Sequence, residues 1–92
     1  MKILIVEDEK LLADSLKTLL ESKGFDVETV YDGISGAEYA ELGVYDLLIL
    51  DVMMPGMDGY GVCKAIREKT DTPVIFLSCL DQPDDKVRGL ML

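Results

Sequence analysis

The chain has 92 residues, of which 49% are apolar, so it can bury one hydrophobic core, and residues 1–92 are expected to form a single domain. Eighteen acidic residues, nine basic residues and no histidine give a formal net charge of −9, and the basic residues form no patch that would bind nucleic acid directly. Since no apolar run approaches the roughly 20 residues of a membrane span and no leader-type segment precedes the first strand, we expect a cytoplasmic protein without a membrane anchor.

The first half of the chain alternates strand and helix patterns. An apolar run over residues 3–6 is typical of a strand that is covered on both faces. Leucines at helical spacing, ending before Gly24, predict a helix over roughly residues 9–22. Residues 25–31 alternate more, which indicates an outer strand, and a weaker helical pattern follows over residues 34–42.

The second half continues the alternation. Residues 46–51 form the next apolar strand, and proline–glycine and aspartate–glycine pairs mark a loop over residues 55–59. A third helix is predicted over residues 60–68, a fourth strand over residues 74–78, and a fourth helix that opens between residues 81 and 85 and carries the chain to residue 92. Because four strand–helix units follow one another, the expected fold is an α/β doubly wound parallel sheet with right-handed crossovers.

Acidic residues follow two of these strands. Glu7, Asp8 and Glu9 come directly after the first strand, and Asp51 ends the third. Parallel strands align their carboxyl ends, so we expect Asp8 and Asp51 to meet in one crevice. Carboxylates held together raise one another's pKa unless a cation lies between them, and Mg²⁺ prefers oxygen ligands. The sequence therefore predicts a magnesium site formed by Asp8, Asp51 and one backbone carbonyl.

The chain resembles a bacterial response-regulator receiver domain over its whole length. The segments that carry the resemblance are Glu7-Asp8, Asp51 with the following Val-Met-Met-Pro-Gly-Met-Asp-Gly of residues 52–59, and Thr72-Pro73 with the strand that ends at Ser78. Residues 85–90 further resemble the branch of this family whose receivers precede a winged-helix DNA-binding domain and regulate transcription. The resemblance implies the flavodoxin-like strand order 2-1-3-4-5.

The resemblance also implies roles for individual residues. Asp51 would be the phosphoacceptor, taking a phosphoryl group from a histidine kinase, because a carboxylate nucleophile can attack phosphorus once Mg²⁺ neutralises the phosphoryl oxygens. The carbonyl of Met53 would complete the metal ligands and Glu7 would act through a water. Ser78 would donate a hydrogen bond to a phosphoryl oxygen. Such a domain is a signalling module and not an enzyme, and at most it assists its own phosphorylation and dephosphorylation.

Each of these residues also has a purely structural interpretation. The acidic cluster at residues 7–9 could cap the first helix and stabilise its dipole by about 0.5–2 kcal/mol. Asp51 could be a solvated loop residue or a cap, and Ser78 an ordinary strand-end hydroxyl. Cys79 is larger than the residue usual at that place in the family, which would narrow access to the phosphoryl group.

Two sets of sulfur-containing residues are interpreted structurally. Met53, Met54 and Met57 are expected to pack the loop beside Pro55, because thioethers favour copper over magnesium. Cys63 and Cys79 lack metal-type spacing and are expected to be reduced thiols.

The receiver pattern is incomplete in these 92 residues. The family continues into a fifth strand with a phosphoryl-neutralising Lys, an aromatic switch residue and a fifth helix; Lys86 lies on the wrong helix to replace that Lys. Two functions stay open: a phosphoacceptor module, or a truncated fragment that serves as a folding or assembly module with an idle acidic site.

An open strand over residues 74–77 predicts a homodimer, formed by strand pairing or by exchange of the helix over residues 84–92.

An aspartate-nucleophile phosphatase is a weaker interpretation. Enzymes of that class need a second Asp two residues after the nucleophile, and position 53 is Met.

Overall fold

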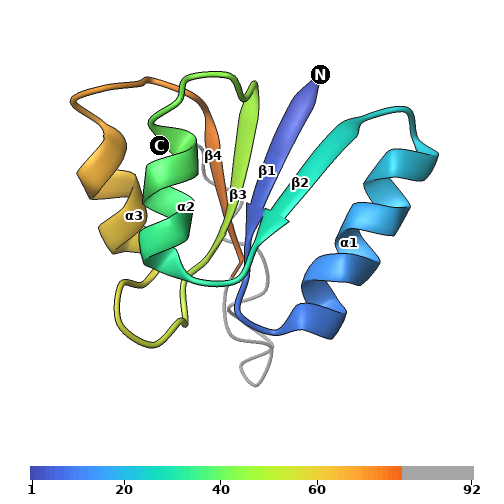
Figure 1. The fold of residues 1–92 in the computed structure, drawn as a ribbon, viewed down its shortest axis with the longest axis horizontal. Helices are drawn as coiled ribbons and strands as arrows, with labels where there is room; N and C mark the ends of the chain where they lie inside the picture. Colours follow the sequence, from blue (N-terminus) through green and yellow to red (C-terminus); the bar gives the residue numbers. More distant parts are fainter. Residues whose placement is uncertain (78–92) are drawn as a thin grey trace.

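A computed structural model of the chain describes residues 1–77, in which strands and helices alternate. The elements are β1 (Lys2–Val6), α1 (Lys10–Ser22), β2 (Asp26–Val30), α2 (Gly33–Ala40), β3 (Leu47–Asp51), α3 (Gly59–Ile66) and β4 (Val74–Leu77). All strand pairs are parallel and the order is β2-β1-β3-β4, which confirms the predicted doubly wound sheet (Figure 1). The helix expected after residue 81 lies outside the described residues.

The sheet has a hydrophobic core on each face. On the α2 and α3 face, the core centres on Leu4, Leu50 and Phe76, which are almost fully buried. On the α1 face, Ile5 and Ala13 belong to a second, smaller cluster (Figure 1). Because β1 and β3 are covered on both faces, their sequences are continuously apolar, whereas the edge strand β2 alternates.

The helices α2 and α3 begin at the same edge of the sheet with matching caps. The side chain of Asp32 accepts a hydrogen bond from the N–H of Ser35 (2.7 Å), and the side chain of Asp58 accepts one from the N–H of Gly61 (2.8 Å). Such caps satisfy N–H groups that have no partner within the helix. The helix α1 differs, because its first flanking residue, Glu9, makes no side-chain cap.

Most element boundaries match the expected ones to within two residues. The helix α2 ends at Ala40 and not at residue 42, because the N–H groups of Leu42 and Gly43 bond back three residues, to Tyr39 and Ala40, in a tight turn. Gly43 leaves that turn with a φ of 71°. The helix α3 likewise covers residues 59–66 and not residues 60–68.

A buried tyrosine links the strands at the end of the sheet opposite the acidic residues. The Tyr45 hydroxyl donates a 2.6 Å hydrogen bond to Glu28 of β2, and the Nζ of Lys2 on β1 lies 3.5 Å from the same carboxylate. Burial, followed by the Glu28 carboxylate, raises the pKa of Tyr45, and the hydrogen bond from Tyr45 lowers the pKa of Glu28. Tyr45 is only 6% exposed, so it belongs to the core and not to the surface.

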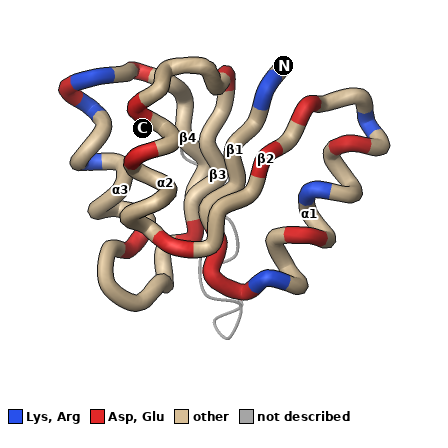
Figure 2. The backbone as a smooth tube through the Cα atoms, in the orientation of Figure 1, with Lys and Arg blue, Asp and Glu red and all other residues tan. Residues whose placement is uncertain are grey.

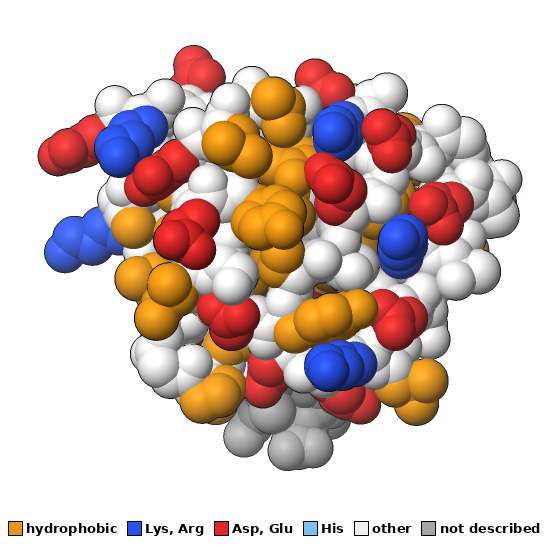
Figure 3. Space-filling model, in the orientation of Figure 1, with side chains coloured by type: hydrophobic (Ala, Val, Ile, Leu, Met, Phe, Trp, Pro, Cys, Tyr) orange, Lys and Arg blue, Asp and Glu red, His pale blue; other side chains and the backbone are white. Residues whose placement is uncertain are grey.

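The surface of the described residues mixes apolar and acidic side chains. Tyr39, Leu42 and Val44, at the end of α2 and in the connection to β3, are exposed, and Figure 3 shows apolar side chains lying between acidic ones on this face. Lysine and arginine residues are scattered along the chain, while acidic segments gather where β1 and β3 end (Figure 2). No helix within residues 1–77 has the length and apolarity needed to cross a bilayer.

Candidate functional site

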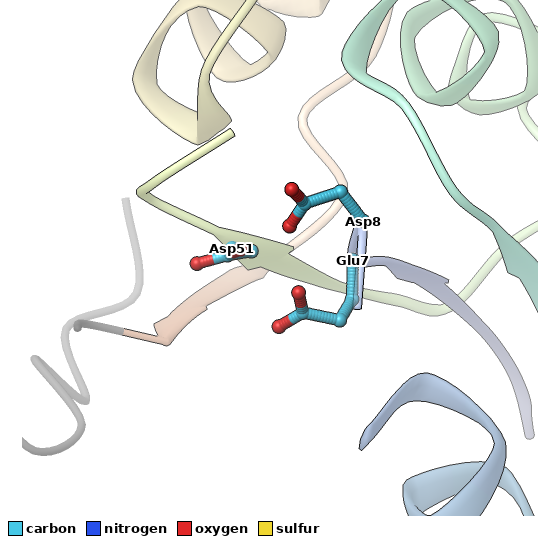
Figure 4. A group of neighbouring side chains, drawn as sticks. All are labelled: Glu7, Asp8 and Asp51. Carbon is cyan, nitrogen blue, oxygen red and sulfur yellow. The ribbon is translucent and has the colours of Figure 1, made fainter. Parts of the chain in front are cut away.

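Three carboxylates meet at the carboxyl edge of the two central strands. The strand β1 ends at Val6, so Glu7 and Asp8 follow it directly, and β3 ends on Asp51. Because β1 and β3 pair in parallel, with Val6 opposite Leu50, these residues reach the same edge. Each of the three side chains has a carboxylate oxygen within 4.8 Å of the others (Figure 4). The predicted convergence of Asp8 and Asp51 is therefore confirmed, and Glu7 joins them.

Two of the three carboxylates are buried. Glu7 is 3% exposed and Asp51 is 7% exposed, whereas Asp8 is exposed. The N–H of Met53 donates a 3.0 Å hydrogen bond to Oδ1 of Asp51, and the N–H of Glu9 donates a 2.9 Å bond to Oε2 of Glu7. Asp51 is therefore neither a solvated loop residue nor a helix cap, since it is the buried last residue of a central strand.

The structure also tests the capping interpretation of residues 7–9. Glu9 flanks the start of α1 but its side chain accepts no cap hydrogen bond, and Glu7 binds the N–H of Glu9, which precedes the helix. The N–H of Glu7 itself is bonded to the carbonyl of Val30 on β2 (3.1 Å). This bond continues the pairing of β1 with β2 and directs the Glu7 side chain into the carboxylate cluster and away from solvent.

Burial makes the cluster costly to ionise. Desolvation raises the pKa of Glu7 to about 8, and the neighbouring Asp51 adds to that increase. Desolvation also raises the pKa of Asp51, against the opposing effect of the hydrogen bond from the N–H of Met53. A cation between the oxygens would remove this cost. The donor set fits a hard divalent ion such as Mg²⁺, because all three side chains offer oxygen and at least one ligand is buried.

Two glycines allow the chain to turn away from Asp51. A Cβ atom at Gly59 would overlap the carbonyl oxygen of Asp51, and a Cβ atom at Gly33 would overlap the carbonyl oxygen of Met57. Each glycine directly follows a capping aspartate and is the first residue of its helix. Both helices therefore begin in close contact with the backbone of residues 51–57, the segment that carries the site. Gly59 belongs to the Asp-Gly pair that marks the loop in the sequence, whereas the close contact at Gly33 was missed, although its Asp-Gly pair repeats the pattern at residues 58–59.

The loop after Asp51 lines an open hollow at the surface. Its volume is about 380 Å³, and it is lined by Val52, Met53, Met54, Pro55 and Asp58. Met54 is buried and Met57 packs against the core, as expected, but the prediction that Met53 packs the loop is wrong, because its side chain is 61% exposed. The neighbouring Met54 fills the core position, which leaves the Met53 side chain outside. Ser78 and Cys79 lie outside the described residues.

The family to which the chain belongs agrees with this geometry. Residues 3–92 match the family model described as the response regulator receiver domain. The chain therefore belongs to the response-regulator receiver domain family. It is 46% identical, over its whole length, to the transcriptional regulatory protein DltR of Streptococcus agalactiae, and it spans 42% of the length of that relative.

Solved structures agree with this assignment. The receiver domain of the Francisella response regulator 1452 is 36% identical with a TM-score of 0.81, over 90% of this chain and 69% of that one. The receiver domain of the sensor histidine kinase PA1611 from Pseudomonas aeruginosa is 31% identical with a TM-score of 0.80, over 92% of this chain and 74% of that one. That receiver has a magnesium ion coordinated in its active-site cleft.

Proposed function

We propose that this receiver domain is a phosphoacceptor module of a two-component response regulator, in which Asp51 takes a phosphoryl group from a histidine kinase with the help of Mg²⁺. The observation that carries the proposal is the convergence of buried Asp51 with Glu7 and Asp8, whose oxygens lie within 4.8 Å of one another. A carboxylate that only supported the fold would not need two further acids beside it, since each adds to the cost of ionisation.

The residues assigned to the metal are Asp8, Asp51 and the main-chain carbonyl of Met53, with Glu7 contributing through a water. Mg²⁺ bound here would neutralise the charge of the phosphoryl oxygens. The magnesium-containing PA1611 receiver supports this assignment by likeness. The acidic cluster supports it chemically, because burial, with Asp51 alongside, raises the pKa of Glu7 to about 8, and a bound cation would offset this cost of ionisation.

Residues of this chain supply the nucleophile and orient it in the transfer step. An oxygen of Asp51 attacks phosphorus, an O–P bond forms as the P–N bond of phosphohistidine breaks, and the imidazole leaves with the electron pair. The N–H of Met53, which holds Oδ1 of Asp51 at 3.0 Å, orients the nucleophile. The chain has no histidine, so the phosphoryl donor is a separate group. We assign Ser78 as a hydrogen-bond donor to the phosphoryl oxygen.

The wider role follows from the relatives. DltR is named a transcriptional regulatory protein, which supports a role in transcription regulation. We propose that this role is carried out in the cytoplasm by a longer protein that contains this module. In that arrangement the receiver itself makes no direct contact with DNA, and a separate output domain does. The homodimer expected from the sequence stays a prediction, and the helix over residues 84–92 that could be exchanged lies outside the described residues.

Phosphoramidate is a suitable test donor, because its P–N bond resembles that of phosphohistidine. Incubation with phosphoramidate and Mg²⁺ should produce a single phosphoryl adduct in the intact mass, and Asp51→Asn should abolish it. Asp71→Asn, a change at an exposed acid outside the cluster, should keep the adduct. Absence of any adduct on the folded wild-type chain would favour the alternative, an assembly module with an idle acidic site.

A further inference from the structure

We propose that the thioether of Met53 is a site of reversible oxidation by peroxide, and that its oxidation slows phosphoryl uptake by Asp51. The second half of this inference rests on the proposed function. The first half rests on the exposure of the Met53 residue, which is 61% exposed.

The three methionines of the loop differ sharply in exposure. Met53 is 61% exposed, whereas its neighbour Met54 is 7% exposed and belongs to the core cluster under α2 and α3. Met57 is partly buried and packs against the same cluster. Peroxide must reach sulfur to oxidise it, so within this loop Met53 is the residue open to attack.

The backbone of Met53 contacts the phosphoacceptor. Met53 lies two residues after Asp51, and its N–H donates the 3.0 Å hydrogen bond to Oδ1 of Asp51. Its side chain lines the hollow of about 380 Å³ together with Val52, Pro55 and Asp58. This space admits both a small oxidant and the added oxygen atom without repacking of the core.

The reaction balances with hydrogen peroxide as the oxidant. The sulfur lone pair attacks one peroxide oxygen, an S–O bond forms as the O–O bond breaks, and water leaves after proton transfer. Sulfur loses two electrons and the peroxide gains them. A dithiol-dependent sulfoxide reductase returns the side chain to the thioether, with the dithiol oxidised to a disulfide and the oxygen released as water.

Oxidation of Met53 adds partial negative charge to an already acidic site. The sulfoxide oxygen carries partial negative charge, and it would be added to the residue whose N–H bonds Oδ1 of Asp51, a member of the cluster of three carboxylates. An incoming phosphoryl donor is anionic, so the added dipole opposes its approach. The sulfoxide is also a strong acceptor that can compete with Asp51 for the N–H of Met53. We expect phosphoryl uptake to slow, because both changes act against the attack of Asp51 on the donor.

The site of oxidation is tested by peptide mapping of the full chain after brief treatment with dilute hydrogen peroxide. Met91 lies outside the described residues, so the test protein carries Met91→Leu. Met1, which is 65% exposed and lies at the far end of β1, serves as the internal reference. Met53 should form sulfoxide at a rate similar to that of Met1 and about tenfold or more faster than Met54. Equal rates at Met53 and Met54 would overturn the inference.

The effect of oxidation on phosphoryl uptake is tested by measuring the phosphorylation rate before and after peroxide treatment. The quantity compared is the rate after treatment divided by the rate before it. The ratio should fall for the wild type, recover after treatment with methionine sulfoxide reductase, and stay at one for Met53→Leu, whatever that variant's own rate. Met1→Leu should behave as the wild type. A fall that persists in Met53→Leu, or no fall in the wild type, would overturn the regulatory half. Failure of the reduced wild type to take any phosphoryl group would instead refute the proposed function and the regulatory half with it, while the peptide map still decides the oxidation site.

Discussion

Glu7 and Asp51 place carboxylate oxygens within 4.8 Å of each other at the end of two central strands, and both side chains are more than nine-tenths buried. Burial raises the pKa of both groups, that of Glu7 to about 8. In the metal-free fold the Glu7 carboxyl group is therefore more stable in its protonated form. The same pair becomes a favourable site as soon as a divalent cation replaces the proton.

The first prediction concerns the stability of the metal-free protein against pH. A carboxyl group whose pKa is raised by folding, from 4.5 to about 8 for Glu7, contributes its full stabilisation below pH 4.5 and loses it as the pH rises towards 8. The loss amounts to about 5 kcal/mol at most, since one pKa unit corresponds to about 1.4 kcal/mol. Urea unfolding followed by circular dichroism, in the presence of a chelator, should show the free energy of unfolding falling between pH 5 and pH 8.

Two variants isolate the contribution of Glu7. Glu7→Gln keeps a neutral side chain of the same shape, so it should remove most of the decline between pH 5 and pH 8. Glu9→Gln, at an exposed neighbour, should leave the decline unchanged. A decline that is as steep in Glu7→Gln as in the wild type would show that another group controls it.

The second prediction concerns magnesium affinity. Because metal ligands bind in their deprotonated form, Mg²⁺ binding should release protons and strengthen as the pH rises from about 6 towards 8. Isothermal titration calorimetry should show weaker binding for Asp8→Asn and for Asp51→Asn, with Asp71→Asn as the unaffected control. Glu7→Gln should flatten the pH dependence. Equal affinity in the wild type and in both Asn variants would refute the assignment of the ligands.

The third prediction compares two glycines of α3. A Cβ at position 59 would collide with the backbone at Asp51, so Gly59→Ala should destabilise the fold by about 2 kcal/mol or more and lower magnesium affinity. At Gly61 the nearest atom to an added Cβ is the Met57 Cγ at 3.1 Å, which belongs to a flexible side chain. Gly61→Ala should stay within about 1 kcal/mol of the wild type, because the gain in helix propensity offsets the crowding. Thermal unfolding with and without Mg²⁺ measures both effects.

The fourth prediction tests the tyrosine link at the other end of the sheet. Tyr45→Phe removes the 2.6 Å hydrogen bond to Glu28 but keeps the ring in the core, so the expected cost is about 1 kcal/mol in urea unfolding at neutral pH. Glu28 is partly exposed and retains Lys2 nearby, which limits the loss. Tyr39→Phe, on an exposed ring, is the matched control and should change stability by less than about 0.5 kcal/mol. Equal effects of the two changes would show that the Tyr45 hydroxyl contributes nothing specific.

Much of the fold was readable from the sequence because two central strands are buried on both faces. Continuous apolar runs at residues 3–6 and 47–50 indicate those strands, and the alternating pattern at residues 25–31 marks β2 as an edge strand. The parallel order then placed Asp8 and Asp51 at one edge, since strand direction alone decides where strand ends meet. Boundaries were less accurate where a turn such as that of Leu42 tightens the end of a helix.

Other features depend on tertiary contacts that no local pattern encodes. Tyr45 lies in a connection, and its burial follows from the position of Glu28, 17 residues earlier. Met53 and Met54 are identical neighbours, so spacing could not decide which one enters the core. The close contact of Gly33 with the Met57 carbonyl links two segments 24 residues apart and becomes visible only when the helices are placed.

The most direct test of the phosphoacceptor assignment is to locate the phosphoryl group itself. The full chain is treated with phosphoramidate and Mg²⁺, the acyl phosphate is reduced with borohydride, and peptides are sequenced by tandem mass spectrometry. Reduction converts an aspartyl phosphate to homoserine, so homoserine at position 51, dependent on both the donor and Mg²⁺, is the predicted result. Homoserine at another aspartate, or none at position 51 in a chain that folds and binds Mg²⁺, would contradict the assignment of Asp51.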